Sequence, residues 1–149
     1  MRPTADRSPA VTRDDLGFLL AKASQRWNEL LYERFVAAGF PDVRPSYGSI
    51  LVPLFEDDGL RIGELGARAR LSKQTMTTMV RLLERDGLVE RRADPSDGRA
   101  ALVFLTERAR SFRPVAEATL AELDRRVARR LSAGGRDELR EALRALADL

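Results

Sequence analysis

The sequence predicts a mainly α-helical fold with a small β-hairpin, a winged helix-turn-helix flanked by long terminal dimerisation helices. Three observations support this prediction. Two short helical patterns lie in the middle of the chain, a turn-rich segment between two alternating segments follows them, and long amphipathic patterns lie on both sides. A chain of 149 residues can bury the core of one ordinary domain without disulfides or metals.

The central pair of helices is expected at residues 62–69 and 72–86. Ser72 opens the second helix, because its hydroxyl can accept a hydrogen bond from an unpaired backbone N–H. One face of that helix is apolar, at Met76, Val80 and Leu83. Gly87 follows it at a position that often adopts a left-handed conformation. Two helices joined in this way form a helix-turn-helix, whose second helix can enter the major groove of DNA.

A β-hairpin is expected after the helix pair. Residues 88–92 alternate between apolar and charged, as a strand does, and residues 100–105 do so less cleanly. Between them, residues 93–99 contain the turn-forming pairs Asp-Pro and Asp-Gly. The pattern predicts a wing with arginine at its tip.

Long helices are expected before and after this unit. The first covers about residues 13–38, begins near a capping-box-like pair formed by Thr12 and Asp15, and has a wide apolar face. That face, which we expect to be buried, comprises Leu16, Leu20, Ala23, Trp27, Leu30 or Leu31, and Phe35. A shorter helix near residues 45–56 has Pro45 in its first turn and Pro53 in its interior, where proline should bend or shorten it.

A last helical region follows the hairpin. Thr106 can cap a long helix, which Pro114 should kink one to two turns in. The segment 132–135 breaks the pattern, and a final helix carries Leu139, Leu143 and Leu146. Terminal helices with apolar faces need a partner, and a second copy of the chain is the simplest one.

Composition excludes several classes of site. The chain has no cysteine and no histidine, so disulfides and thiol switches are impossible and a zinc, copper or iron site is disfavoured. We expect no metal and no cofactor. The apolar run at residues 50–55 is far too short to span a membrane, and no signal sequence is visible, so the expected location is the cytoplasm. Residues 61–99 hold nine basic and six acidic side chains, which is the whole net charge of +3.

Three motifs carry a resemblance to a known family. They are LERDGLV at residues 83–89, DPSDGR at 94–99 and LTE at 105–107, and they follow the Lys/Gln-rich helix. At these spacings, with long helices on both sides, the chain resembles the MarR family of winged-helix transcriptional regulators. The resemblance covers nearly the whole chain after the first ten residues.

The resemblance implies a domain plan and a function. Residues 11–44 would form a dimerisation helix with its connection, 45–106 the winged DNA-binding region, and 107–149 further dimerisation helices. Residues 1–10, which hold two prolines and show no periodicity, are expected from their composition to be a disordered arm. The implied function is that of a homodimeric transcriptional regulator, expected to be a repressor, on a palindromic double-stranded DNA operator. Family members commonly respond to small aromatic or phenolic anions, which implies release from DNA by such an effector.

The polar face of the helix 72–86 supplies the candidates for reading DNA. Glutamine and basic side chains can bind adenine and guanine edges, and threonine can contact a thymine methyl group. The candidates are Ser72, Lys73, Gln74, Thr75, Thr77, Thr78 and Arg81. These residues could equally be the solvated side of a surface helix, and Ser72 could serve only as a cap. The wing that follows favours the DNA-reading interpretation.

Arg99 is the leading candidate on the wing. An arginine there can insert into a narrow minor groove, and the resemblance implies this role, with Asp97 orienting the guanidinium or fixing the turn. Arg91 and Arg92 are expected to contact phosphates at the base of the wing. The alternative for Arg99 is a loop salt bridge of small stabilising value. Ala101 stands where many relatives have a further basic residue, so fewer wing contacts are expected here.

An effector pocket is the least defined expectation. Trp27, Tyr47 and Phe55 could line it, although aromatic residues at helical spacing more often belong to a core. We expect this protein not to be an enzyme, since no clustered catalytic pair or phosphate-binding glycine loop is visible. Two other readings remain: a regulator without a ligand, and a winged-helix module for protein assembly that does not bind DNA.

Overall fold

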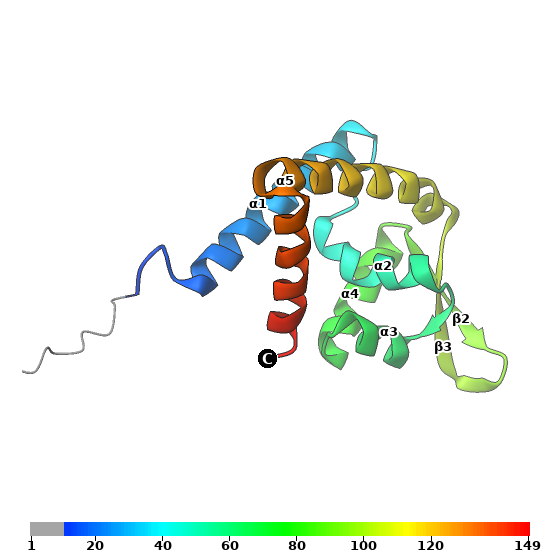
Figure 1. Ribbon diagram of the computed structural model, residues 1–149. Coiled ribbons are helices and arrows are strands. Elements are labelled where there is room, and N and C mark those ends of the chain that lie inside the picture. Colours follow the sequence, from blue (N-terminus) through cyan, green and yellow to red (C-terminus); the bar gives the residue numbers. More distant parts are fainter. Residues whose placement is uncertain (1–10) are drawn as a thin grey trace, which may run out of the picture.

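The computed structural model describes residues 11–149 and has the expected mainly helical fold with a small antiparallel sheet (Figure 1). The predicted arm, residues 1–10, lies outside the described residues. In Figure 1 the first part of α5 runs across the top of the view, above α2, α3, α4 and the sheet. The elements in chain order are α1 (Leu16–Ala37), the 3₁₀ helix η1 (Pro45–Tyr47), α2 (Gly48–Glu56), β1 (Leu60–Arg61), α3 (Ile62–Ala69), α4 (Lys73–Arg85), β2 (Val89–Asp94), β3 (Asp97–Leu105) and α5 (Glu107–Ala147).

The sheet has three antiparallel strands in the order β1-β3-β2, whereas the sequence predicts only a hairpin. The additional strand, β1, has two residues and pairs with β3, with Leu60 opposite Val103. Two residues are too few to show an alternating pattern, so the sequence does not reveal this strand. Asp58 holds the start of β1 against the sheet, because its carboxylate accepts the backbone N–H of Leu105 at 2.9 Å.

The hairpin turn is shorter than the seven residues that the sequence predicts, because both strands extend further and leave two residues between them. The strand register also shifts within the hairpin. Ala93 faces Ala101, but the next residue, Asp94, faces Asp97, so three residues of β3 form a bulge. Arg99 lies in this bulge and not at the tip of the turn, which corrects its predicted place.

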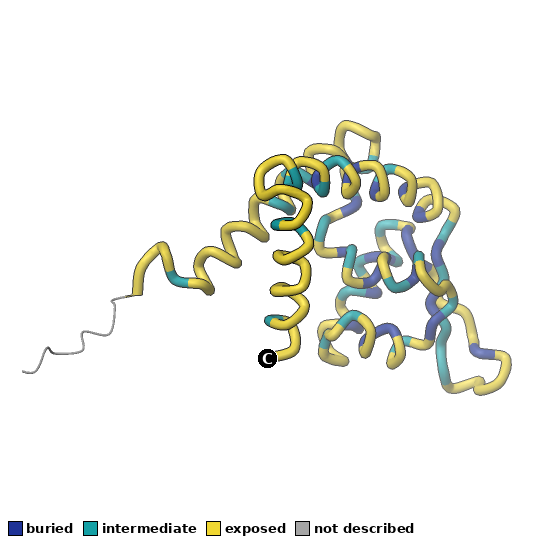
Figure 2. Tube along the Cα trace, viewed as in Figure 1, coloured by how far each residue is buried: buried dark blue, intermediate teal, exposed yellow. Residues whose placement is uncertain are grey.

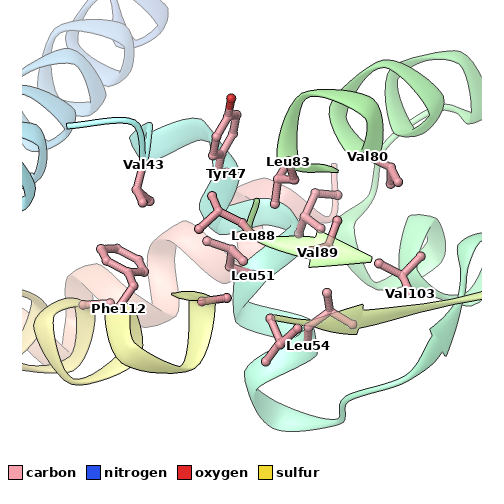
Figure 3. Close-up of a cluster of buried hydrophobic side chains, with 14 of the residues drawn as sticks. Val43, Tyr47, Leu51, Leu54, Val80, Leu83, Leu88, Val89, Val103 and Phe112 are labelled. Atoms are coloured by element: carbon pink, nitrogen blue, oxygen red, sulfur yellow. The ribbon is translucent and has the colours of Figure 1, made fainter. Parts of the chain in front are cut away.

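The core lies between α2, the helix pair, the sheet and the start of α5 (Figure 3). The predicted apolar face of α4 is confirmed, since Met76, Val80 and Leu83 are all buried. The other fully buried large side chains are Val43, Tyr47, Ile50, Leu51, Leu54, Leu65, Leu88 and Val103. α1 joins this core through Phe35, whose ring meets that of Phe112 edge-on with 4.7 Å between centroids.

α1 differs from its prediction in its start and in its burial. The helix begins at Leu16 and not near residue 13, because Thr12 and Asp15 form a turn ahead of it, with the Thr12 N–H donating to the Asp15 carboxylate at 2.7 Å. Of its apolar face only Leu31 and Phe35 are buried. Figure 2 shows the first half of α1 almost entirely exposed. The predicted burial of this half is therefore wrong for the single chain.

α2 tolerates its internal proline. Pro45 lies in the first turn as predicted, and the chain enters α2 through one turn of 3₁₀ helix. The α-helix then continues past Pro53 to Glu56, and the Pro53 carbonyl accepts the N–H of Asp57 at 3.0 Å. Proline removes only its own N–H from the helix, and the bonds that follow it are intact.

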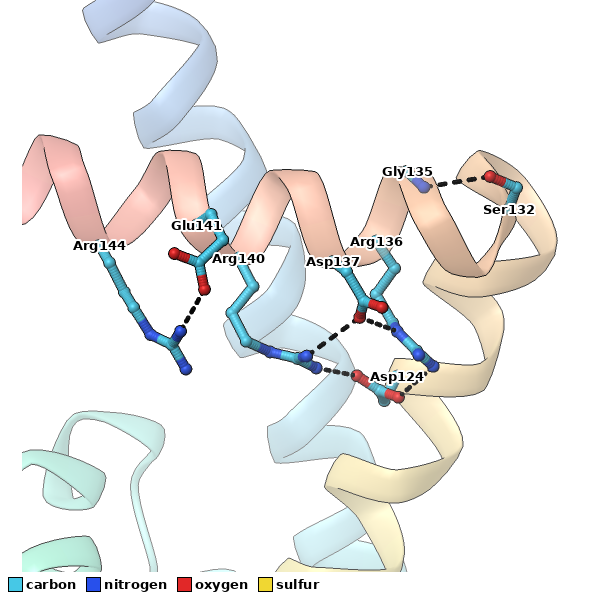
Figure 4. A network of polar contacts seen from close by, with 8 residues as sticks. All are labelled: Asp124, Ser132, Gly135, Arg136, Asp137, Arg140, Glu141 and Arg144. Carbon is cyan, nitrogen blue, oxygen red and sulfur yellow. Dashed lines mark hydrogen bonds and ion pairs between the residues drawn. The ribbon is translucent and has the colours of Figure 1, made fainter.

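α5 breaks at Ser132, within the segment 132–135 where the sequence predicts a break, and shows no irregular dihedral angle at Pro114, where a kink is predicted. Pro114 keeps helical dihedral angles, whereas Ser132 has φ of 70° and ψ of 166°. The hydroxyl of Ser132 accepts the N–H of Gly135 at 3.1 Å and so caps the second segment (Figure 4). Asp124, before the break, accepts bonds from Arg136 at 2.9 Å and from Arg140 at 3.0 Å, after it. These bonds hold the two segments at a sharp angle.

The end of α5 returns to the helix-turn-helix. Arg70, in the turn between α3 and α4, has a left-handed conformation with φ of 54°. Its guanidinium donates to the carbonyl of Ala147 at 2.7 Å and to the carboxylate of Asp148 at 2.6 Å. A cation is favoured at this helix end, where the last carbonyl groups lack partners.

Candidate nucleic-acid interface

The N-terminus of α4 is capped as predicted. The hydroxyl of Ser72 accepts the backbone N–H of Thr75 at 3.2 Å and donates to the Thr75 hydroxyl at 2.9 Å. Both side chains are exposed. The first backbone N–H groups of α4 therefore lie at the surface, and the positive end of a helix favours an anion such as a phosphate.

The polar face of α4 is exposed along its length. The exposed candidates are Ser72, Lys73, Gln74, Thr75, Thr77, Thr78 and Arg81. The hydroxyl of Thr77 donates to the carbonyl of Lys73 at 3.0 Å, and that of Thr78 donates to the carbonyl of Gln74 at 3.2 Å. These two threonines can therefore offer a ligand an oxygen acceptor and a methyl group but no free hydroxyl hydrogen.

Two cations on this face are available for a ligand. Within residues 11–149, no carboxylate forms an ion pair with Lys73 or Arg81. Arg85 differs, because it donates two bonds to the neighbouring Asp86, at 3.0 and 3.3 Å. The free positive charge of α4 therefore lies in its first three turns.

The three wing arginines have different surroundings. Arg91 donates to the carboxylate of Glu84 at 2.7 Å, and Arg92 pairs with Glu90 while its guanidinium lies 4.3 Å from the centroid of the Phe104 ring. These two cations are partly neutralised within the protein. Arg99, by contrast, is exposed and has no ion pair in the described part of the chain.

Asp97 fixes the backbone of the wing. Its carboxylate accepts the N–H of Arg99 at 3.1 Å, which is one of the two roles that the sequence analysis leaves open. The guanidinium of Arg99 is not involved in that bond. The arrangement holds the bulge in place and leaves the Arg99 side chain free to contact a ligand.

Comparison with known proteins places this chain in a family. The model of the MarR family matches residues 45–101. The HTH-type transcriptional repressor Rv2887 of Mycobacterium tuberculosis is 38% identical over 93 residues, which are 62% of this chain and 67% of that protein. A probable transcriptional regulator from Pseudomonas aeruginosa is 31% identical, with a TM-score of 0.77 over 89% of this chain and 97% of that structure. The chain belongs to the MarR family.

Two further MarR-like structures share the fold. PcaV from Streptomyces coelicolor, solved in complex with its natural ligand, is 23% identical and has a TM-score of 0.78 over 94% of this chain and 97% of that one. The repressor CouR, solved bound to a 23-mer DNA duplex, is 24% identical, with a TM-score of 0.76 over 93% of this chain and 99% of that one. As a MarR-family protein, the chain is a DNA-binding transcriptional regulator and not an enzyme.

The three aromatic residues proposed for an effector pocket lie in separate places. Trp27 lines a cavity of about 690 Å³ between α1 and the two segments of α5. Phe55 is half-buried beneath Arg113, whose guanidinium lies 5.3 Å from the ring centroid. Tyr47 is buried in the core. In this MarR-family chain the three side chains therefore do not line one common cavity.

Tyr47 instead joins η1 to the end of α4. Its hydroxyl donates to the carboxylate of Asp86 at 2.5 Å. Burial raises the pKa of Tyr47, and the hydrogen bond to Asp86 raises it further. The bonds from Arg85 and then from Tyr47 lower the pKa of Asp86. The neutral phenol and the charged carboxylate thus stabilise each other and fix the C-terminus of α4.

A polar cluster that the sequence does not predict lies under the wing. Arg61 on β1 pairs with Asp94 on β2 at 2.7 Å, and Asp94 also accepts the N–H and the hydroxyl of Ser96, at 2.9 and 2.7 Å. The bonds from Ser96 and the charge of Arg61 lower the pKa of Asp94. The Asp-Pro-Ser order indicates the local turn, but nothing local indicates the arginine 33 residues earlier.

Within residues 11–149 no group of three or more carboxylates lies close enough together to hold a metal ion. Over the same range, none of the helices is both long enough and apolar enough to cross a bilayer.

Proposed function

We propose that this MarR-family chain binds a palindromic operator as a homodimer, represses transcription there, and is released by a small molecule. In this proposal α4 enters the major groove and the wing reaches the adjacent minor groove. The observation that carries the proposal is the exposed polar face of α4, with Lys73 and Arg81 unpaired within residues 11–149, next to a wing whose Arg99 is also unpaired. A module used only for protein assembly would not require an exposed polar helix face with unpaired basic side chains.

The exposed apolar residues of α1 and α5 support the proposed dimer. They include Leu16, Phe18, Leu19 and Leu20 on α1, and Leu120, Leu131, Leu139 and Leu143 on α5. Exposed apolar faces often mark interaction surfaces, and a second copy would cover the same faces by symmetry. On this basis we assign residues 11–44 and 107–149 to dimerisation and residues 45–106 to DNA binding.

We assign reading and anchoring roles within the winged region. Gln74, with Lys73 and Arg81 beside it, would read base edges, and Arg99 would enter the minor groove. Ser72 and Thr75 would anchor a phosphate at the helix N-terminus, and Thr77 and Thr78 would contact thymine methyl groups through their own. Arg91 and Arg92 would add weaker phosphate contacts, since each already faces a carboxylate.

The effector would be a small organic anion. The cavity beside Trp27 supports this, because its volume of about 690 Å³ suits a small ligand and three of its arginines, Arg126, Arg129 and Arg130, have no ion pair within residues 11–149. Tyr47 and Phe55 would act indirectly, through the core.

Operator selection from a random duplex library, followed by fluorescence anisotropy, tests the proposal. The selected sites should be palindromic, and a dimer with about eight phosphate contacts should give a slope of log K against log salt near −7. The double substitution Lys73→Ala with Arg81→Ala should abolish selective binding, whereas Arg125→Ala, an exposed arginine of α5, should leave it unchanged. Failure to enrich any duplex would contradict the proposal.

A further inference from the structure

The cluster under the wing has a geometry that links three parts of the winged region. In the sheet order β1-β3-β2, Arg61 lies on one outer strand and Asp94 on the other. Their 2.7 Å ion pair therefore connects the outer strands across β3. Arg61 is also the N-cap residue of α3, so the same side chain ties the wing to the first helix of the helix-turn-helix.

The burial of Asp94 distinguishes this pair from the other ion pairs within residues 11–149. The side chain of Asp94 is only 7% exposed and that of Arg61 is 49% exposed, whereas the arginine and carboxylate of a neighbouring pair, Arg68 and Asp57, are 37% and 59% exposed. Removing the partner of a buried charge costs more free energy than breaking an exposed pair, because water cannot hydrate the charge that remains. Without Arg61 the carboxylate of Asp94 would keep only its bonds from Ser96, so the turn should be held less firmly.

The bulge that carries Arg99 is connected to the ion pair of Arg61 and Asp94. Asp94 is paired with Asp97 across the hairpin, and Asp97 in turn accepts the backbone N–H of Arg99. A chain of contacts thus runs from Arg61 through Asp94 and Asp97 to the backbone of Arg99. Bulges direct side chains away from the regular strand positions, so a displaced turn would change where the Arg99 guanidinium points.

We propose that Arg61 is a positioning residue for DNA binding, which acts by holding Asp94 and so placing Arg99 for the minor groove. The inference rests on the proposed function for its DNA-binding consequences. Arg61 acts through the wing and does not itself have to touch DNA, which is a role that the proposed function does not include.

Charge changes of opposite sign give the sharpest test. Arg61→Ala removes a positive charge from the protein, and Asp94→Asn removes a negative one. Both should weaken operator binding, by about tenfold, the scale of coupling within one network. If the cluster mattered only through its charge, Asp94→Asn would strengthen binding to the DNA polyanion. Glu90→Gln is the matched control, because it neutralises an exposed carboxylate of the same strand and should leave affinity equal or higher.

A double-mutant cycle separates positioning from direct contact. Arg61→Ala combined with Arg99→Ala should bind no more than about twofold more weakly than Arg99→Ala alone, since both substitutions remove the same contact. Losses that multiply would mean that Arg61 contacts DNA itself, and the proposal would be overturned. Arg68→Ala, which breaks exposed pairs on α3, controls for loss of one arginine nearby.

A measurement without DNA keeps this inference distinct from the proposed function. Trypsin can cut after Arg99 only when the wing opens locally, so the cutting rate reports how firmly the wing is held. Arg61→Ala and Asp94→Asn should speed this cut several-fold at unchanged global stability, and Arg68→Ala should not. Equal cutting rates in all variants would overturn the positioning role of Arg61, even if the protein binds its operator. Faster cutting in a protein that binds no operator would support the hold of Arg61 on the wing and refute the proposed function.

Discussion

The winged region, residues 45–106, buries most of its apolar residues, whereas the first half of α1 and the last segment of α5 leave theirs largely exposed. Ile50, Leu65 and Leu83 of the winged region are 0% exposed. Leu16 at the start of α1 is 61% exposed and Leu143 near the end of α5 is 44% exposed. The core of the winged region, which includes residues at the start of α5, is thus complete within one chain. The first half of α1 and the end of α5 leave apolar side chains exposed, and in the proposed dimer a second copy would cover them.

Truncating the core of the winged region should have the largest effect. Leu83→Ala removes a fully buried side chain from α4, so the free energy of unfolding should fall by about 2–5 kcal/mol. Urea unfolding followed by circular dichroism measures this change. The loss should not depend on protein concentration, because the cavity forms within one chain. A loss that grows on dilution would contradict the contrast between the two regions.

Placing charge on the terminal helices should affect assembly instead. Leu139→Asp with Leu143→Asp should convert the dimer to a monomer at micromolar concentration and weaken operator binding at least about 100-fold, because the two winged regions would no longer bind as one unit. Sedimentation velocity and anisotropy measure the two effects. The matched control, Glu138→Gln, changes an exposed neighbouring position without charging the apolar face. A monomeric variant with full operator affinity would refute the proposed dimer.

The bond between Tyr47 and Asp86 should make the end of α4 sensitive to acid. The folded-state pKa of Asp86 lies below its ordinary value of 3.8, so its contribution is complete above that value and is lost as the pH falls through the lower, folded one. Tyr47→Phe should cost about 1.5–3 kcal/mol at pH 7, as expected for a hydrogen bond to a charged group, and less near pH 3. Thermal melts of both proteins from pH 7 to pH 3 test this, and an unchanging difference would contradict it.

The two DNA-reading elements should differ in what they recognise. Gln74→Ala should relax the preference at particular positions within each half-site, by about 1–3 kcal/mol for a bidentate contact. Arg99→Ala should act mainly at A·T-rich flanks, where groove width and not base identity sets the energy. Binding across an operator library, with circular dichroism as the folding control, separates the two patterns. If Arg99→Ala leaves the preference for A·T-rich flanks unchanged, the proposed minor-groove role of the wing is wrong.

Local signals allowed much of the winged region to be predicted. Ser72 and Thr106 cap their helices with the expected bonds, and Gly87 adopts the expected left-handed conformation with φ of 72°. Each of these depends on residues within three or four positions. The same reason explains why the α3 and α4 boundaries are nearly correct.

The errors arise where distant residues decide the structure. β1 exists because Asp58 binds the backbone of Leu105 far along the chain, and the anchor of the wing joins Arg61 to Asp94. The break in α5 falls in the predicted segment 132–135, but the arginines beyond it that donate to Asp124 and hold its angle are not predicted. Pro114, where a kink is predicted, keeps helical dihedral angles. No pattern within a short window contains such pairs, so the candidate residues could be named from the sequence but their positions on the wing could not.

The number of chains bound to one operator tests the central claim most directly. Sedimentation equilibrium of the protein with a duplex that carries the selected palindrome should give two chains per duplex, and a duplex with one half-site should bind at least about 100-fold more weakly. Leu139→Asp with Leu143→Asp should remove that difference between the two duplexes. One chain per palindrome, with equal affinity for a single half-site, would show that the exposed faces of α1 and α5 do not serve to join two winged regions on DNA.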